Sequence, residues 1–143
     1  MKQELDKYLC KVYPKMMVNR NKPMTETCMC WGFECGDGWF QILNQLMGNI
    51  QNHIDWKNRN GEVVTQVTLD QVKEKFGTLR FYYTGGDDVI DGMVRMAESM
   101  SGVTCEVCGK PGTSTGGGWI KTVCKEHGGQ DYDTLEEELD DAT

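Results

Sequence analysis

The chain has 143 residues, of which 38% are hydrophobic and 26% are charged, and this composition is typical of a soluble protein with one hydrophobic core rather than of a disordered one. No apolar run approaches the roughly 20 residues that a transmembrane helix requires, and the amino terminus is charged where a signal peptide is apolar. We therefore expect a cytoplasmic protein with no membrane partner.

The formal net charge of -7 is concentrated at the carboxyl end. Seven of the 22 acidic residues lie in residues 131–143, which contain no Lys or Arg, so the rest of the chain is neutral. We predict one domain over residues 1–130 and an acidic, disordered tail over residues 131–143, with a decoy for a basic host surface as the alternative role of the tail. Duplex DNA is an unsuitable partner, because binding it requires a basic surface.

Three segments carry apolar residues at the three- and four-residue spacing of an amphipathic helix. The first covers residues 5–17. The second covers residues 39–54, and Asp37 is in position to cap its amino terminus. The third covers residues 89–100, and one of the two aspartates before it is the expected cap.

Residues 62–84, between the second and third helices, are rich in β-branched and aromatic side chains. They predict an antiparallel hairpin whose two strands are separated by the charged residues 73–75. Side chains alternate between the two faces of a strand, so one face of the second strand belongs to the core and the other is available for binding. The expected core face consists of Leu79, Phe81 and Tyr83, and the expected free face of Thr78, Arg80 and Tyr82.

Residues 104–128 contain two ligand pairs, C-x2-C and C-x2-H, formed by Cys105, Cys108, Cys124 and His127. A tetrahedral zinc ion needs four N or S ligands, and one tight turn delivers two of them from each pair. A glycine follows each pair, which suits the positive φ that ends such a knuckle. We predict a bound Zn²⁺ ion with a structural role, because four protein ligands leave no position for a catalytic water.

These elements predict an α+β fold with about three helices, a central antiparallel β-hairpin and a carboxy-terminal zinc knuckle that belongs to the same domain. No nucleophile, base and orienting group come together in the sequence, so we expect a protein that is not an enzyme.

Three further cysteines, Cys28, Cys30 and Cys35, form a C-x-C-x4-C pattern with three open interpretations. They are small buried side chains of a loop, or they bind a second metal ion together with Cys10 or His53. In the third interpretation Cys35 is a reactive thiol, because it lies just before a helix amino terminus.

The hairpin combines cations with aromatic rings, namely Lys73, Lys75, Phe76, Arg80 and Tyr82. Cations suit the phosphates of an anionic ligand and rings stack on its bases, so this set predicts a site for a nucleotide or a single-stranded nucleic acid. The alternative is an ordinary solvated strand face.

Three sequence blocks together resemble a family of small uncharacterised proteins of tailed phages and prophages. They are CWGFECGDGW at residues 30–39, VKEKFGTLRFYY at residues 72–83, and the CxxCG…CxxHG ending. The resemblance covers residues 10–128 and implies a virus-encoded accessory protein that acts in a bacterial host cytoplasm.

Two functions remain open. In the first, the protein counters host defence by sequestering a small anionic ligand such as a cyclic nucleotide-like signal. In the second, it is a zinc-knuckle interaction module that docks on a host protein or nucleic acid. A homo-oligomer is compatible with both functions, since ligand sites often lie between subunits.

Overall fold

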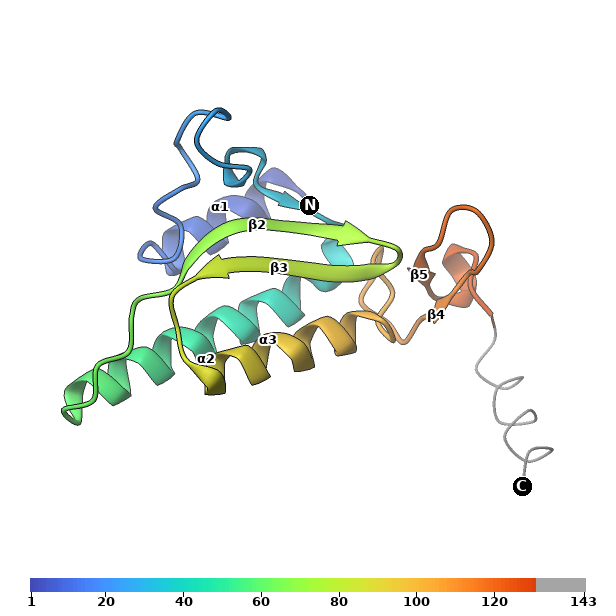
Figure 1. Ribbon diagram of the computed structural model, residues 1–143. Helices are drawn as coiled ribbons and strands as arrows, with labels where there is room; N and C mark the ends of the chain where they lie inside the picture. Colours follow the sequence, from blue (N-terminus) through green and yellow to red (C-terminus); the bar gives the residue numbers. More distant parts are fainter. Residues whose placement is uncertain (131–143) are drawn as a thin grey trace, which may run out of the picture.

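The computed structural model describes residues 1–130, so the predicted acidic tail of residues 131–143 lies outside the described residues. The chain forms an α+β fold with three α-helices and two small sheets in that range, and the predicted fold class is confirmed (Figure 1). The helices are α1 (Gln3–Val12), α2 (Phe40–Arg59) and α3 (Asp88–Ser101), and the strands are β1 (Phe33–Glu34), β2 (Thr68–Lys75), β3 (Thr78–Thr84), β4 (Thr113–Ser114) and β5 (Thr122–Val123).

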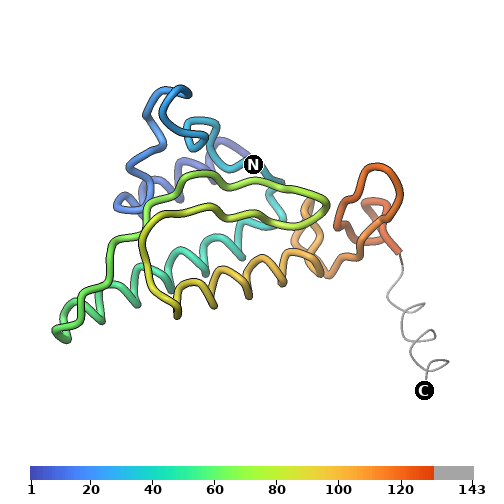
Figure 2. Tube along the Cα trace, in the orientation of Figure 1, coloured from blue at the N-terminus to red at the C-terminus, as the bar shows by residue number. Residues whose placement is uncertain are grey.

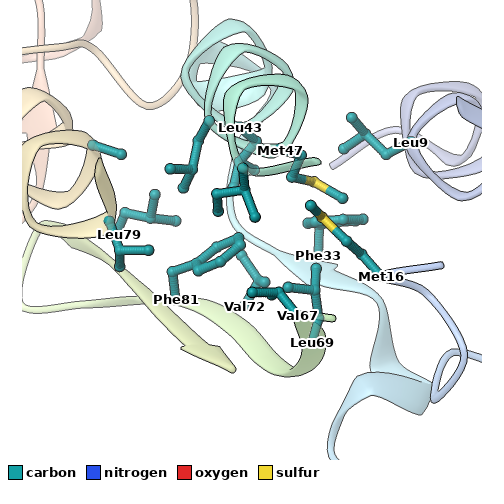
Figure 3. Close-up of a cluster of buried hydrophobic side chains, with 14 of the residues drawn as sticks. Leu9, Met16, Phe33, Leu43, Met47, Val67, Leu69, Val72, Leu79 and Phe81 are labelled. Carbon is teal, nitrogen blue, oxygen red and sulfur yellow. The ribbon is translucent and has the colours of Figure 1, made fainter. Parts of the chain in front are cut away.

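The larger sheet has the order β1-β2-β3, in which β2 and β3 form the antiparallel hairpin and β1 runs parallel to β2. Helices α2 and α3 lie side by side along one face of this sheet (Figure 1). Apolar side chains from the three helices, the sheet and the connecting loops meet between these layers and form the core. Figure 3 labels Leu9, Met16, Phe33, Leu43, Met47, Val67, Leu69, Val72, Leu79 and Phe81 in this cluster.

Side chains alternate along β3 as predicted, because Leu79 and Phe81 are buried whereas Arg80 is half-buried and Tyr82 is exposed. The side chains on the predicted free face of β3 are thus less buried than those on its core face.

The chain reverses between β2 and β3 at a different place from the one predicted. Residues 73–75 belong to β2, and the turn consists of Phe76 and Gly77. Both turn residues have positive φ, 53° and 80°, which is the requirement of the two-residue type I′ turn. Charge is compatible with a strand that has one solvated face, so the charged run did not mark the turn.

Two helix boundaries also differ from the predictions. Helix α1 ends at Val12 rather than near residue 17, because Pro14 disfavours a helical conformation in the residue before it. Asp37 does not cap α2. Its carboxylate instead accepts a hydrogen bond from the backbone N–H of Lys2 at 2.7 Å. The cap predicted for α3 is confirmed, since the side chain of Asp87 accepts from the backbone N–H of Ile90 at 3.0 Å.

Candidate metal centre and the adjoining hairpin

The four predicted metal ligands converge on one point. The Sγ atoms of Cys105, Cys108 and Cys124 and a ring nitrogen of His127 all lie within 4.8 Å of one another. The separation is 3.7 Å between Cys108 Sγ and Cys124 Sγ, and also 3.7 Å between Cys105 Sγ and His127 Nδ1. Four ligand atoms that surround a zinc ion tetrahedrally at about 2.3 Å are separated by about 3.8 Å. The cluster can therefore hold a metal ion of this size.

Local backbone geometry explains how the two ligand pairs form. Gly109 and Gly128, which follow the pairs, have φ of 81° and 101°, as the sequence predicted. Strands β4 and β5 pair between the two knuckles and bring them together. The intervening loop of residues 115–121 closes on itself, because the backbone N–H of Thr115 donates to the carbonyl of Lys121 at 2.8 Å.

The environment of Cys105 favours the thiolate that a metal ion binds. Burial opposes ionisation of this thiol, but backbone N–H groups of Cys124, Cys108 and Val107 donate to its sulfur and outweigh the burial. Together they lower the pKa of Cys105 to about 6. At neutral pH this ligand is therefore ready to bind a cation.

The first knuckle packs against the loop that precedes α2. The backbone N–H of Gly38 donates to the carbonyl of Glu106 at 2.8 Å, and that of Gly36 donates to the Glu106 carboxylate at 2.9 Å. The indole N–H of Trp39 donates to the carbonyl of Thr104 at 2.9 Å. A Cβ atom on Gly36 or Gly38 would lie 2.3 or 2.1 Å from a backbone oxygen of the knuckle. This close approach explains the glycines at positions 36 and 38.

The second knuckle packs against the tip of the hairpin. The hydroxyl of Thr122, in β5, donates to the carbonyl of Gly77 at 2.6 Å in a buried position. A Cβ on Gly77 would lie 3.2 Å from the backbone of Lys121. Figure 2 shows the result, with the orange and red knuckle segment lying at the tip of the green hairpin. The metal cluster thus joins two segments that are far apart in the sequence.

The residues predicted to bind a nucleotide-like ligand fall into two groups. Lys73 and Arg80 are direct cross-strand partners on the free face of the sheet, and Tyr82 lies on the same face. Neither Lys73 nor Arg80 forms an ion pair within residues 1–130, although Glu34 of β1 is the parallel-register partner of Lys73. The Nε atom of Arg80 is buried and has no hydrogen-bond partner among the described residues.

The second group lies at the hairpin tip. The ring of Phe76 is 67% exposed, and Lys75 Nζ lies 5.6 Å from its centroid. Lys75 and Phe76 line a cavity of about 430 Å³ together with Trp119, which is 77% exposed. Sequence reasoning missed Trp119. An aromatic residue directly after three glycines in a surface loop was the available signal.

The remaining cysteines do not gather into a second cluster. Cys28 is exposed, the Cys30 thiol donates to the carbonyl of Thr27 at 3.3 Å, and Cys35 lies in the hydrophobic core. Among the described residues these three form no group of converging ligand atoms. Burial raises the pKa of Cys35 to about 12, which keeps this thiol protonated and contradicts the hypothesis of a reactive thiolate.

Cys10 and His53, the other candidate ligands of a second metal ion, have different partners. The Cys10 thiol lies 3.6 Å from a carboxylate oxygen of Asp6. His53 Nε2 lies 2.7 Å from Asp87 Oδ2 at the amino terminus of α3. Both side chains therefore contribute to local packing and capping contacts.

No protein-family model, curated protein or solved structure matches this chain. The resemblance to phage and prophage proteins accordingly stays a prediction. The helices described within residues 1–130 lack the combination of length and apolarity with which a helix spans a bilayer.

Proposed function

We propose that the protein is a non-enzymatic binding protein for a small phosphate-bearing, nucleotide-like ligand, and that its metal centre is a structural zinc site. The ligand-binding proposal rests on Lys73 and Arg80, two adjacent cations that form no ion pair within residues 1–130. Like charges directly opposite each other on neighbouring strands destabilise a sheet. An anion bound between them removes this repulsion and provides an acceptor for the buried Arg80 Nε.

The charge distribution of the domain supports a small ligand rather than a long polyanion. The domain as a whole is neutral, so a large basic surface is lacking, but two or three converging cations suffice for one or two phosphates. Lys75 adds a third cation to this face, because it lies two residues after Lys73 in β2 and such residues share one face of a strand.

The ligand chemistry supports zinc as the metal. Three thiolates and one imidazole are soft and borderline ligands that suit zinc, whereas Mg²⁺ and Ca²⁺ prefer oxygen. The four protein ligands complete a tetrahedral shell, which is the arrangement of structural sites. In this role the zinc ion holds the knuckle against the loop before α2 and against the hairpin turn.

The biological setting follows from the predicted family resemblance. A phage accessory protein that binds a nucleotide-derived signal in the host cytoplasm would lower the free concentration of that signal and so weaken the defence that depends on it. No bond of the ligand needs to be broken for this effect.

A thermal-shift and calorimetric panel of cyclic dinucleotides, cyclic trinucleotides and ADP-ribose derivatives tests the proposal. We expect at least one compound to raise Tm of the zinc-loaded protein, and Arg80→Gln or Lys73→Gln to weaken its binding at least tenfold. Arg59→Gln is the matched control, because Arg59 is an exposed arginine at the carboxyl end of α2. If every phosphate-bearing compound leaves Tm unchanged, or binds Arg80→Gln as well as the native chain, the proposal is wrong.

The alternative function, docking on a host protein, is supported by a different surface. Helices α2 and α3 line an apolar groove of about 670 Å³ in which Met96 and Met100 are 65% and 48% exposed. Flexible methionines suit the apolar face of a partner helix. A partner captured from host lysate by the native chain and by Arg80→Gln, but lost with Met96→Glu, would support this function. A partner retained by Met96→Glu would contradict it.

A further inference from the structure

The hairpin turn contains a residue, Phe76, whose backbone conformation is strained and whose side chain is not buried. Phe76 has a φ of 53° and is the one non-glycine residue with positive φ among residues 1–130. The first central position of a type I′ turn favours Asn, Asp or Gly, and a bulky side chain there is a genuine outlier. Burial does not compensate for this strain, because 67% of the ring remains exposed. Strained backbone of this kind marks candidate functional positions.

A second exposed ring faces the same space. Trp119 is 77% exposed and lines the cavity of about 430 Å³ that Phe76 also lines. A volume above about 300 Å³ is in the range of small-molecule sites. Lys75 lines the same cavity and places its ammonium group 5.6 Å from the Phe76 ring centroid.

The two rings are carried by segments that are fixed to each other. The turn is anchored to β5 by the hydrogen bond from the Thr122 hydroxyl to the Gly77 carbonyl at 2.6 Å. The loop that carries Trp119 is closed at its base by two bonds between Thr115 and Lys121, of 2.8 and 3.1 Å. One residue of each anchor, Lys121 or Thr122, lies just before Cys124, so the anchors connect both ring-bearing segments to the metal cluster.

We propose that Phe76 and Trp119 form a stacking site for the nucleobase of the ligand whose phosphates bind at Lys73 and Arg80. This inference rests on the proposed function and adds a chemical class to it, a planar heteroaromatic ring. Phe76 directly follows β2 and lies three residue steps beyond Lys73, which at the rise of a strand is about 10 Å and matches the span from a base to the phosphates of one nucleotide. Every nucleobase can stack on an aromatic ring, so the choice of base is not critical and ADP is a suitable probe.

The experiment compares ADP, pyrophosphate and adenosine by titration calorimetry on the zinc-loaded full chain. Stacking on aromatic side chains contributes about a 5- to 150-fold change in affinity for each base, so the native chain should bind ADP at least fivefold more tightly than pyrophosphate. Phe76→Asn should abolish this difference and leave the affinity for pyrophosphate unchanged. Asn is favoured at this turn position, so the variant should fold with an equal or higher Tm.

Two further variants separate the possible failures. Trp119→Ser should also remove the preference for ADP, whereas Arg80→Gln should weaken ADP and pyrophosphate by the same factor. If Phe76→Asn and Trp119→Ser both bind ADP like the native chain while Arg80→Gln does not, the stacking site is refuted and the phosphate site stands. If neither ADP nor pyrophosphate binds, the ring site survives only if adenosine binds and Phe76→Asn removes that binding, and the panel of cyclic nucleotides and ADP-ribose derivatives then decides the proposed function.

Discussion

The substitution Gly38→Ala tests whether the metal knuckle holds the domain together. Gly38 lies in the loop before α2, where an added Cβ would lie 2.1 Å from the carbonyl oxygen of Cys105 and 2.6 Å from the backbone of Glu106. The φ of Gly38 is not in the left-handed region, so alanine adds no backbone strain there. The variant therefore reports the contact with the knuckle, together with the small stabilisation that alanine gives by lowering the entropy of the unfolded chain.

The magnitude follows from what must separate. The two backbones must move apart by about 1 Å before a methyl group fits, since ordinary contacts between carbon and oxygen begin near 3.2 Å. This movement breaks the hydrogen bond from Gly38 N–H to the Glu106 carbonyl and strains the one from the Trp39 indole to Thr104. With about 1 kcal/mol for the broken bond, about 0–1 kcal/mol for the strained bond and about 1–2 kcal/mol for overpacking, we expect a loss of about 2–4 kcal/mol in the free energy of unfolding.

Urea denaturation of the zinc-loaded protein measures this loss, and a chelator competition assay measures the accompanying fall in zinc affinity. Gly92→Ala is the matched control, because a Cβ at Gly92 meets nothing within 4 Å and the residue lies inside α3. That substitution should stabilise the protein by about 0.5–1 kcal/mol through the helix preference of alanine. If Gly38→Ala matches the native chain in both assays, the knuckle does not depend on this contact, and our inference that it holds the domain together is wrong.

Two further predictions concern the same cluster. Thr122→Val keeps the side-chain shape but leaves the buried Gly77 carbonyl without its hydrogen-bond donor. The free energy of unfolding measured by urea denaturation should therefore fall by about 1–3 kcal/mol. Amide hydrogen exchange should become faster at residues 76–78 and stay at the native rate in α2. In the metal-free protein the folded state lowers the pKa of Cys105 from 9.0 to about 6, so the unfolded chain binds more protons in this window and the free energy of unfolding should rise between about pH 6 and pH 9. The pKa of the neighbouring Cys108 is raised above 9.0, partly by Cys105 itself, so its contribution has the opposite sign and belongs to the range above pH 9. A flat profile that is the same in Cys105→Ser would contradict the assignment of this dependence to Cys105.

Local sequence signals predicted those parts of the molecule that local interactions determine. The spacing of the two ligand pairs and their glycines predicted the metal cluster, because each pair is a turn that its own residues form. The stripes of apolar residues predicted the three helices, and an aspartate before a helix predicted the cap at Asp87.

The predictions that were wrong involve contacts between distant segments. Asp37 has the sequence context of a helix cap. Its carboxylate instead accepts a hydrogen bond from the backbone N–H of Lys2, which is 35 residues away in the chain. The two residues of β1 have no strand signal of their own, and they pair with β2 because burial of Phe33 aligns it with Val72. Trp119 could not be joined to Phe76 from sequence, since that proximity depends on where β5 meets the turn.

Under the proposed function, the arrangement predicts that the metal and the ligand influence each other's binding without direct contact. The candidate metal ligand Cys124 is the residue directly after β5, and His127 follows three residues later. Hydrogen bonds of Thr122 in β5 and of the preceding Lys121 hold the hairpin turn and the base of the loop that carries Trp119. Removing the metal should therefore loosen the proposed stacking site while the Lys73 and Arg80 pair, which lies within the sheet, keeps its geometry. Coupling between two binding equilibria is reciprocal, so a bound nucleotide must tighten the metal by the same factor by which the metal tightens the nucleotide. Pyrophosphate, which engages only the cation pair, should show little of this coupling, and the contrast between the two ligands locates the coupling at the hairpin tip.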